Sequence, residues 1–280
     1  MFQTIKSTQD DSVNFIKRDF DGWVECRYVR RSPEYFCVYL SSQTGCNRGC
    51  KFCHLTATQQ TSAYDVNTEG FLEQAQTVLR YSKSQPKAKE VNFNWMARGE
   101  PLANRIFLGN ARPILEQLYG LANKYKVAPK FNISTIFPKT FKQSLVKTFR
   151  HTPTFYYSLY SMNKDFREKW IPGAMDPEKA LDLLADYQAV TRKIVMLHWA
   201  FIDGENDSLE DLDRIVKALD VRGLIVDFNL VRYNPFSNES QESPFLARNL
   251  EYMQENIRGK AKMVSRVGLD VKASCGTFIS

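Results

Sequence analysis

Hydrophobic and polar residues alternate in two short stretches near the start of the chain. This alternation predicts strands over residues 23–29 and 35–40, separated by a break at residues 31–33. Residues 1–22 are polar and carry charges of both signs, so we expect a short, loosely held entry segment. Further along, Thr68 is the expected N-cap of a helix that runs to about Ser82 with its apolar residues on one face.

The remainder of the chain changes repeatedly between strand and helix periodicity. The expected strands are 91–96, 130–135, 154–160, 193–201 and 224–231, and the expected helices are 107–125, 139–149, 177–190 and 208–219. A helix over 245–257 and a strand near 263–267 precede a short tail. Strands that alternate with helices form a parallel sheet, either doubly wound or curled into a barrel, and both arrangements place function at the carboxyl ends of the strands.

The composition indicates one large α/β domain in a reducing compartment. The 280 residues are 43% hydrophobic, which is enough for a sizeable core. No run approaches the roughly 18 apolar residues of a membrane span. Half of the six cysteines lie in one loop, which is typical of metal ligands and reactive thiols rather than of a disulfide framework. We therefore expect a cytoplasmic monomer without membrane contact.

The net charge of +7 comes from one segment. Residues 117–164 contain no Asp or Glu, and they include eight basic residues: Lys124, Lys126, Lys130, Lys139, Lys142, Lys147, Arg150 and Lys164. Without these eight, the chain has 30 basic against 31 acidic residues. Aromatic residues lie between the basic ones, so the segment could neutralise phosphates and stack on bases, or it could be a solvated basic face whose aromatic rings pack into the core.

A compact group of cysteines is the strongest chemical signal. Cys46, Cys50 and Cys53 can all approach one metal centre, and a trio with no fourth cysteine nearby would leave one iron of a [4Fe–4S] cluster open. Zinc would have to use His54 as its fourth ligand, and adjacent side chains at 53 and 54 converge poorly. Residues 50–54 also fit the C-x-x-C-H pattern of covalent haem, which requires export, and the N-terminus has no apolar signal core. The spacing therefore favours iron–sulfur over zinc and haem.

Ordered motifs along the chain resemble one known family. The cysteine spacing, with Phe52 before the third cysteine, resembles the radical S-adenosylmethionine (SAM) signature. Residues 41–46, with the sequence Ser-Ser-Gln-Thr-Gly-Cys, resemble the RlmN/Cfr-type adenine methyltransferases of ribosomal and transfer RNA. Further matches follow in order over residues 23–280: Gly99-Glu100-Pro101-Leu102, Ile133-Ser134-Thr135, Ser158-Leu159-Tyr160, Asp203-Gly204-Glu205-Asn206-Asp207, Asn229-Leu230, Asn234-Pro235-Phe236 and Ala273-Ser274-Cys275-Gly276.

This resemblance implies a fold and two cofactors. The expected fold is α/β, a partial (β/α)6 radical SAM barrel over residues 36–240, with an N-terminal strand extension over 1–35 and a C-terminal helix, strand and tail over 241–280. A [4Fe–4S] cluster would be held by Cys46, Cys50 and Cys53, and SAM would bind at the open iron. The implied SAM-binding residues are Phe52, Gly99, Glu100, Ser134, Ser158, Leu159, Tyr160 and Asn234, with Glu100 at the SAM amino group. An external electron donor such as flavodoxin is also implied.

The same resemblance implies how a methyl group is moved. Cys275 would carry the methyl, which one SAM supplies, while a second SAM supplies the radical that activates it toward an adenine carbon. Glu25 would be the base that removes the ring proton, and a second thiol would release the product by forming a disulfide with Cys275. The family position for that thiol falls on Tyr39, so Cys37, on the same face of the strand, is the expected resolving cysteine, with Cys26 as the alternative.

Departures from the family pattern leave the substrate open. Arg98 stands where the family has an apolar residue, Tyr160 stands where it has His, and only about 22 residues precede the first matching strand, so we expect the family's N-terminal RNA-binding domain to be absent. The first hypothesis is methylation of an adenine carbon in RNA, with the basic segment 117–164 contacting the RNA. The alternatives are a radical SAM enzyme for another nucleotide or a small molecule, and a non-catalytic metal-cluster protein that binds nucleic acid.

Overall fold

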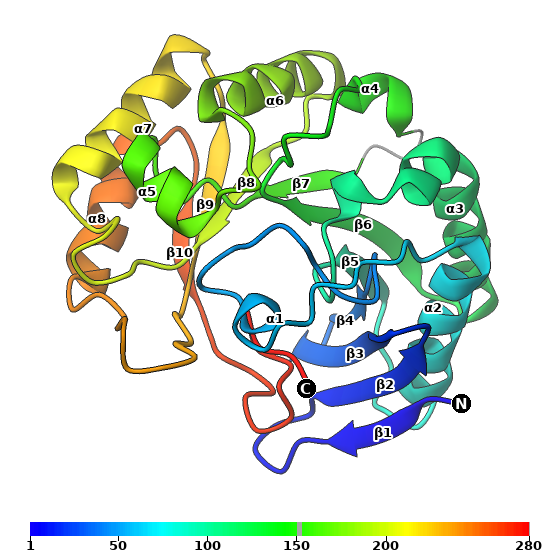
Figure 1. The fold of residues 1–280 in the computed structure, drawn as a ribbon. Coiled ribbons are helices and arrows are strands. Elements are labelled where there is room, and N and C mark those ends of the chain that lie inside the picture. Colours follow the sequence, from blue (N-terminus) through cyan, green and yellow to red (C-terminus); the bar gives the residue numbers. More distant parts are fainter. Residues whose placement is uncertain (150–152, 280) are drawn as a thin grey trace.

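Ten strands form one sheet, and their order across the sheet is the same as their order along the chain (Figure 1). The computed structural model describes residues 1–149 and 153–279. Antiparallel pairs join the first four strands: β1 (Gln3–Lys6), β2 (Val13–Asp19), β3 (Gly22–Ser32) and β4 (Tyr35–Leu40). From β4 onward the pairs are parallel, through β5 (Glu90–Trp95), β6 (Ala128–Thr135), β7 (Thr154–Tyr157), β8 (Val195–Trp199), β9 (Val226–Val231) and β10 (Ala261–Val264).

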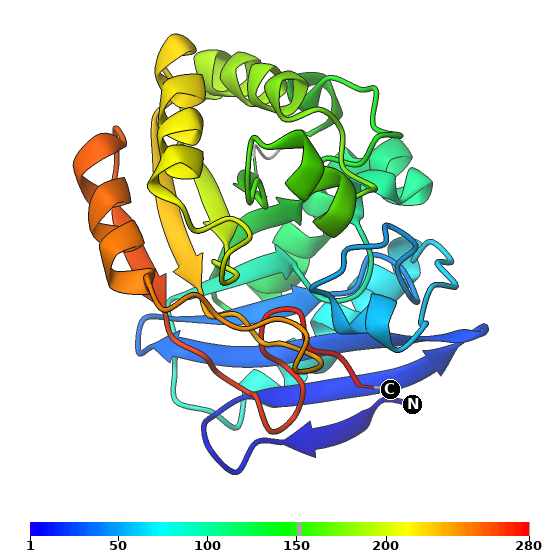
Figure 2. The same ribbon diagram turned by 60° about the vertical axis from the view of Figure 1, so that its left-hand side comes forward.

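The longer helices connect the parallel strands along the outer side of the curved sheet, and shorter ones lie in the loops (Figures 1 and 2). They are α1 (His54–Ala57), α2 (Thr68–Ser82), the 3-10 turn η1 (Pro101–Ala103), α3 (Arg105–Lys124), α4 (Leu145–Thr148), α5 (Lys164–Trp170), α6 (Pro177–Thr191), α7 (Leu209–Val221) and α8 (Leu246–Asn256). The predicted partial barrel is confirmed, with β10 as a further parallel strand beyond β9. Within the described ranges, no helix combines the length and apolar character that a bilayer crossing requires.

Alternation along the strands separates an apolar outer layer from a polar interior. In β5, Val91, Phe93 and Trp95 are buried, and the Trp95 ring stacks on Phe107 of α3 with 4.9 Å between centroids. The residues between them face the other side, where Asn132 Nδ2 of β6 donates to Asn94 Oδ1 at 2.7 Å. Because side chains of a strand alternate between faces, the hydrophobic core lies between sheet and helices and the barrel interior is left polar.

The N-terminal segment differs from its prediction. Residues 1–22 contain β1 and β2, which continue the sheet next to β3, and Val13, Phe15 and Ile16 are at most 4% exposed. The expectation of a loosely held entry segment is therefore wrong. The short apolar run in this segment forms a stable strand only when it pairs with β3. The polarity of the segment itself does not reveal that pairing.

Two helix predictions also change. The predicted helix over 139–149 is reduced to α4, because Lys139 N donates to Gly173 O at 2.9 Å and Phe141 N closes a turn on Pro138 O at 2.9 Å. Helix α2 has its predicted bounds, but its N-cap is Asn67, whose side chain accepts from Gly70 N at 2.9 Å, instead of Thr68. Helix α5 was not predicted.

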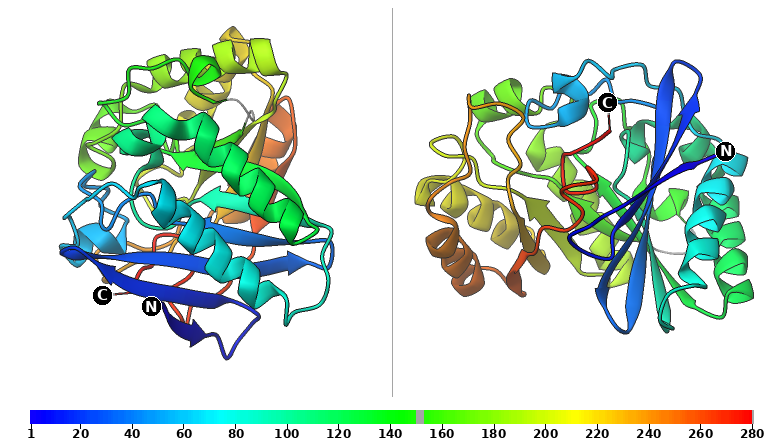
Figure 3. Two further views of the ribbon diagram at one scale, coloured as in Figure 1. Left: turned by 90° about the vertical axis from the view of Figure 1, so that its right-hand side faces the viewer. Right: turned by 90° about the horizontal axis from the view of Figure 1, so that it is seen from below.

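The C-terminal tail returns across the barrel opening after β10. Figure 3 shows the tail between the first strands and the end of the sheet that carries β10. Its contacts join segments at the two ends of the chain, since Asp10 accepts from Gly268 N at 2.7 Å and Asn14 Nδ2 donates to Val271 O at 3.2 Å. The tail is therefore held against β2 and β3.

Candidate active site

One cavity lies at the carboxyl ends of the parallel strands, where the barrel topology leads us to expect function. It is lined by residues from the loop after β4, from the ends of β5 to β9 and from the tail. Among the lining residues are Cys46, Cys50, Phe52, Cys53, Gly99, Glu100, Ser134, Ser158, Tyr160 and Cys275. The structure therefore brings ten of the predicted site residues to one cavity.

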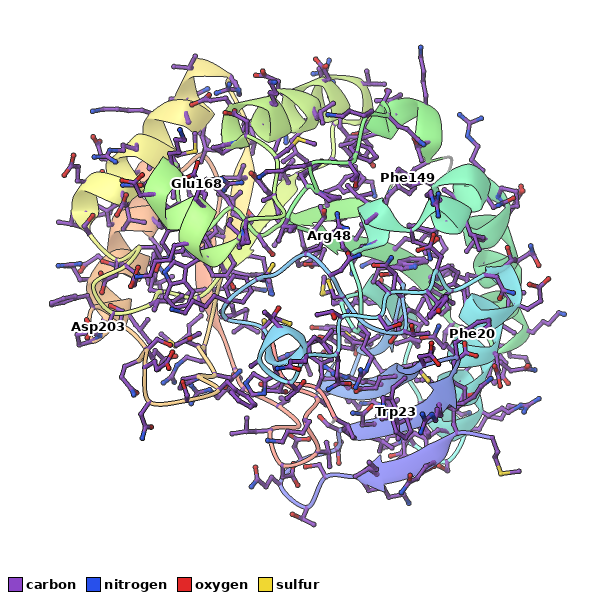
Figure 4. The ribbon with its side chains drawn as sticks, in the orientation of Figure 1. Phe20, Trp23, Arg48, Phe149, Glu168 and Asp203 are labelled. Atoms are coloured by element: carbon purple, nitrogen blue, oxygen red, sulfur yellow. The ribbon has the colours of Figure 1, made fainter. Side chains whose placement is uncertain are left out.

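The cysteine loop is held in place by backbone contacts with distant segments. Cys46 N donates to Gln60 O at 3.0 Å, and Lys51 N donates to Trp170 O at 2.9 Å. Cys53 then provides the N-cap of α1. These contacts explain how a loop with little regular structure can present three cysteines toward one space. Figure 4 shows Arg48, between the first two of these cysteines, toward the middle of the molecule.

The three thiols fit an iron–sulfur cluster better than a single metal ion. Burial raises the pKa of Cys46 to about 12 and raises the pKa values of Cys50 and Cys53, and a bound metal would favour their thiolate forms. In the part of the chain that the structure describes, no three His, Cys, Asp or Glu side chains converge on one ion. A cluster accepts wider spacing because each cysteine binds a different iron. His54 Nε2 lies 3.2 Å from Asn234 O instead of lining the cavity.

Glu100 is fixed by a tight turn at the end of β5. Its carboxylate accepts from Thr135 Oγ1 at 2.7 Å, Leu102 N at 3.0 Å and Ile136 N at 3.1 Å. Burial nevertheless raises the pKa of Glu100 to about 7. Gly99 adopts φ +90°, and a Cβ there would lie 2.6 Å from Ser42 Oγ and 2.7 Å from Gln43 N, so this position requires glycine. A buried carboxylate with spare acceptor capacity is suited to an ammonium group.

Two aromatic rings form a wall beside the cysteines. Phe52 and Tyr160 stack with 4.4 Å between centroids and 18° between ring planes. Ser134 and Ser158, at the ends of β6 and β7, add hydroxyl groups to the lining, whereas Leu159 is buried in the core. An aromatic wall next to polar strand ends is the kind of surface that binds a purine ring.

Cys275 reaches the cavity from the tail. Its thiol is exposed to the cavity, although the surrounding barrel raises its pKa to about 11. Asn234 does not line the cavity, but its Nδ2 donates to Cys275 O at 2.8 Å, and His54 N donates to Gly276 O at 3.0 Å. Asn234 therefore contacts the segment that carries the thiol.

Like Leu159 and Asn234, the residues Glu25, Cys37 and Cys26 lie outside the cavity lining. Glu25 is 0% exposed and outside the cavity lining, with its carboxylate bound to Arg27 and Arg98. Cys37 is 4% exposed and Cys26 is 0% exposed, and neither lines the cavity. Cys37 shares a face of β4 with Tyr39, which does line the cavity.

Sequence reasoning missed several cationic residues of the cavity: Arg27, Arg31, Arg48, Arg232 and Arg266. Arg31 Nη1 donates to Ser265 O at 2.8 Å, and Arg232 Nε donates to both carboxylate oxygens of Glu242 at 2.8 and 2.9 Å. His198 also lines the cavity, and burial with nearby Arg31 lowers its pKa to about 4. These residues come from separate segments, so only the fold reveals the group.

The basic segment 117–164 does not form one continuous face. Lys124, Lys126 and Lys130 lie near the start of β6, at the barrel end opposite to the cavity, because Ser134 and Thr135 at the end of that strand line the cavity. The interleaved rings Phe137, Phe141 and Phe149 are at most 3% exposed. Arg150 lies outside the described residues. The segment therefore does not form a single basic surface, since β6 crosses the barrel within it. These three rings pack into the core, as in the alternative interpretation, whereas Tyr119 is 43% exposed.

Comparison with known proteins identifies relatives but no matching family model. A dual-specificity RNA methyltransferase RlmN from Campylobacter jejuni strain 81-176 is 29% identical over 259 residues, which are 88% of this chain and 68% of the relative. The RlmN of a Nitratiruptor species is 26% identical over 280 residues, which are 97% of this chain and 71% of the relative.

A solved structure of a radical SAM methyltransferase from Sphaerobacter thermophilus has the same fold. It superposes with a TM-score of 0.78 at 18% identity, and the match covers 98% of this chain and 79% of the other. The ordered motifs, the barrel and the RlmN relatives agree. Over most of its length the chain is therefore similar to RNA methyltransferases named RlmN, and it shares the fold of a solved radical SAM methyltransferase.

Proposed function

We propose that this protein methylates an adenine carbon in RNA, with the methyl group carried on Cys275. One observation carries the proposal: Cys275, at the far end of the chain, lies in the same cavity as Cys46, Cys50 and Cys53. The relatives are named as dual-specificity RNA methyltransferases, which supports RNA as the substrate class.

Different residues of the cavity would bind the two cofactors, the [4Fe–4S] cluster and SAM. Cys46, Cys50 and Cys53 would hold the [4Fe–4S] cluster and leave one iron for SAM. Bound together, the cluster and SAM supply a radical that removes a hydrogen atom. Glu100 would accept the SAM amino group, and the ring wall would lie along the adenine.

Cys275 would then act on the substrate side of the cavity. Its thiol would lose a proton when it receives the methyl group. After a hydrogen atom has been removed from that methyl group, its carbon would join the adenine carbon, and the ring would then give up its proton and one electron, which the bound cluster would accept. The sulfur–carbon bond on Cys275 would break when a second thiol forms a disulfide with Cys275, and the released carbon would take up the proton of that thiol to complete the methyl group. Cys37 is the candidate, and because it lies deeper in the barrel than Tyr39, the tail would have to move toward it.

The arginines supply a means of recognising RNA at the cavity. Arg48 extends from the cysteine loop with its guanidinium bound to the Asn47 side chain, and Arg31 of β3 also lines the cavity. Guanidinium groups bind phosphate in a bidentate manner, and they suit an anionic substrate near the reacting carbon. The basic group at the cavity replaces segment 117–164 in this role.

A second candidate function keeps the radical chemistry and changes the substrate to another nucleotide or a small molecule. It is favoured by one specific observation: neither Glu25 nor Cys37, the predicted base and resolving thiol of the adenine-carbon route, lines the cavity beside Cys275.

The two candidates are separated by nucleoside mass spectrometry of RNA from cells with the native protein, with its Cys275→Ala variant, and without the protein. The proposal predicts a methyladenosine that is present only with the native protein. Equal methyladenosine levels in all three samples would favour the second candidate.

A further inference from the structure

We propose that Arg98 is a positioning residue, and that Glu25, Arg27 and Arg98 form an anchoring triad that holds the Cys275 tail over the cavity. In this arrangement Glu25 is the counter-ion of the triad and not the base that acts on the substrate. The functional part of the inference rests on the proposed role of Cys275 as methyl carrier, but the anchoring itself does not.

The three side chains of the triad form one buried ionic group. Arg98 Nη2 and Nε donate to Glu25 Oε1 at 2.6 and 2.8 Å, and Arg27 Nη2 donates to Glu25 Oε2 at 2.8 Å. All three side chains are at most 2% exposed. Charges this deeply buried are retained when they are paired, and two guanidinium N–H groups on one carboxylate oxygen fix the orientation of Arg98 as well as its charge.

Every member of the triad also binds the tail. Glu25 Oε1 accepts from Ile279 N at 3.0 Å, Arg27 Nη2 donates to Thr277 O at 2.9 Å, and Arg98 Nη2 donates to Ile279 O. The ring of Phe278 lies between these contacts, 5.0 Å from the Arg27 guanidinium and 5.7 Å from that of Arg98. The triad therefore binds both sides of Phe278 through the backbone and the ring itself through cation–π contacts.

The tail on the other side of Cys275 is bound through the same carboxylate. Asn14 Nδ2 donates to Glu25 Oε2 and to Val271 O, both at 3.2 Å. Contacts on residues 271, 277 and 279 thus bracket Cys275 along the chain. Since these contacts involve backbone atoms, they fix the register of the tail and with it the position of the thiol.

Arg98 links this anchoring to the SAM side of the cavity. It directly precedes Gly99 and Glu100, and its own backbone is held by Ser42 N, which donates to Arg98 O at 2.7 Å. One rigid turn therefore places both the Glu100 carboxylate and the main contact of the tail. This geometry makes Arg98 a means of setting the distance between the SAM site and Cys275.

The same contacts leave Glu25 without a route to a substrate. Oε1 has three donors and Oε2 has two, and the side chain is 0% exposed. A general base must come within hydrogen-bond reach of the proton that it removes. Burial alone would raise the pKa of Glu25, but Arg27 and Arg98 together hold it below its usual value, which also makes the carboxylate a weaker base.

Hydrogen–deuterium exchange of the full-length reconstituted protein tests the anchoring directly. In Arg98→Met we expect amides of residues 271–279 to exchange about tenfold faster or more, with amides of β8 close to native. Arg98→Lys keeps the positive charge but lacks the forked guanidinium. Its tail amides should therefore exchange at a rate between those of the native protein and Arg98→Met. A folded Arg98→Met protein whose tail exchanges at the native rate would overturn the proposal.

Two further variants distinguish release of the tail from a general loss of stability. Glu25→Gln/Arg98→Met keeps the net charge of the triad and should still release the tail. Arg222→Met breaks a different arginine pair, with Glu178 and Asp182 at 2.6 and 2.7 Å, and should leave tail exchange unchanged. Equal acceleration of tail exchange in Arg222→Met and Arg98→Met would contradict a specific anchor.

If Arg98 positions the tail, its loss should affect the rate of methyl transfer to RNA more than the rate of reductive SAM cleavage. Arg98→Met should keep reductive SAM cleavage within about threefold of native and lower methyl transfer to RNA about tenfold or more. Parallel loss of both rates would contradict positioning of the tail. If Glu25→Gln abolishes transfer while tail exchange stays native, Glu25 acts in the chemistry and the proposal fails. Should the protein methylate no RNA at all, the exchange experiment still tests the anchor separately.

Discussion

The rings of Phe52 and Tyr160 are parallel neighbours, with 4.4 Å between centroids, although one comes from the cysteine loop and the other from the segment after β7. Tyr160 reaches this position with φ +62°, a left-handed conformation that is uncommon for a bulky residue. Asn206 Nδ2 holds that conformation by donating to Tyr160 O at 3.1 Å. Strain maintained at a cavity wall is typical of a functional position.

Removal of the Tyr160 ring should weaken SAM binding. We expect Tyr160→Ala to lower SAM affinity about tenfold, because half of the aromatic wall is lost, while the iron–sulfur absorbance is retained. Tyr160→Phe keeps the ring and should bind SAM nearly as the native protein does. Equilibrium dialysis with reconstituted protein measures both, and native affinity in Tyr160→Ala would show that the wall does not contact SAM.

SAM affinity should rise with pH through the neutral range. Burial raises the pKa of Glu100 to about 7, so the carboxyl is mainly protonated below that pH and ionised above it. Only the ionised form pairs with an ammonium group, so affinity at pH 6 should be about tenfold lower than at pH 8. Glu100→Gln should bind weakly with a flat profile. If SAM affinity keeps its native pH dependence in Glu100→Gln, that dependence must come from the titration of another group.

A single methyl group at Gly99 should disturb the turn that carries Glu100. In Gly99→Ala the new Cβ meets Ser42 and Gln43 at 2.6 to 2.7 Å with φ +90°, and we expect a loss of about 1–3 kcal/mol in the free energy of unfolding together with weak SAM binding. Gly120 of α3 has open space around it, so Gly120→Ala should stabilise the protein by about 0.5–1 kcal/mol. Chemical denaturation measures both. Equal stability of the two variants would contradict the packing described for the turn.

The two cysteines outside the cavity should behave differently. If Cys37 resolves the intermediate, Cys37→Ser should trap RNA on Cys275 as a covalent adduct, visible as a shifted band on a denaturing gel. Cys26, 0% exposed in the core, provides the matched control, and Cys26→Ser should turn over without an adduct. An adduct with Cys26→Ser alone would make Cys26 the resolving thiol and Cys37 the bystander. If neither variant forms an adduct, neither cysteine takes part in the reaction.

Local patterns predicted the elements whose packing follows their own periodicity. Helix α2 has the predicted bounds because Phe71, Ala75, Val78 and Leu79 form one buried stripe. The same logic failed for residues 139–149, where Phe141 is buried in a turn instead of on a helix face. It also failed for β1 and β2, whose stability depends on pairing with β3.

Much of the candidate site could be anticipated because its motifs are short and ordered. The cysteine trio, Gly99-Glu100 and Cys275 were predicted from spacing and resemblance, and the fold brings them together. The cavity arginines could not be predicted, because they gather from β3, the cysteine loop and the segments near β9 and β10. The anchoring of the tail by Arg98 was equally hidden, since a departure from a family pattern does not reveal its new partner.

The most direct test of the methyl-carrier assignment is peptide mass spectrometry after anaerobic incubation of the reconstituted protein with RNA and SAM that carries a trideuterated methyl group. We predict that the label appears on the peptide that contains Cys275 and, in turnover, in a methyladenosine of the RNA, and that Cys275→Ala shows neither. An unlabelled Cys275 peptide, or labelled RNA from Cys275→Ala, would contradict the assignment.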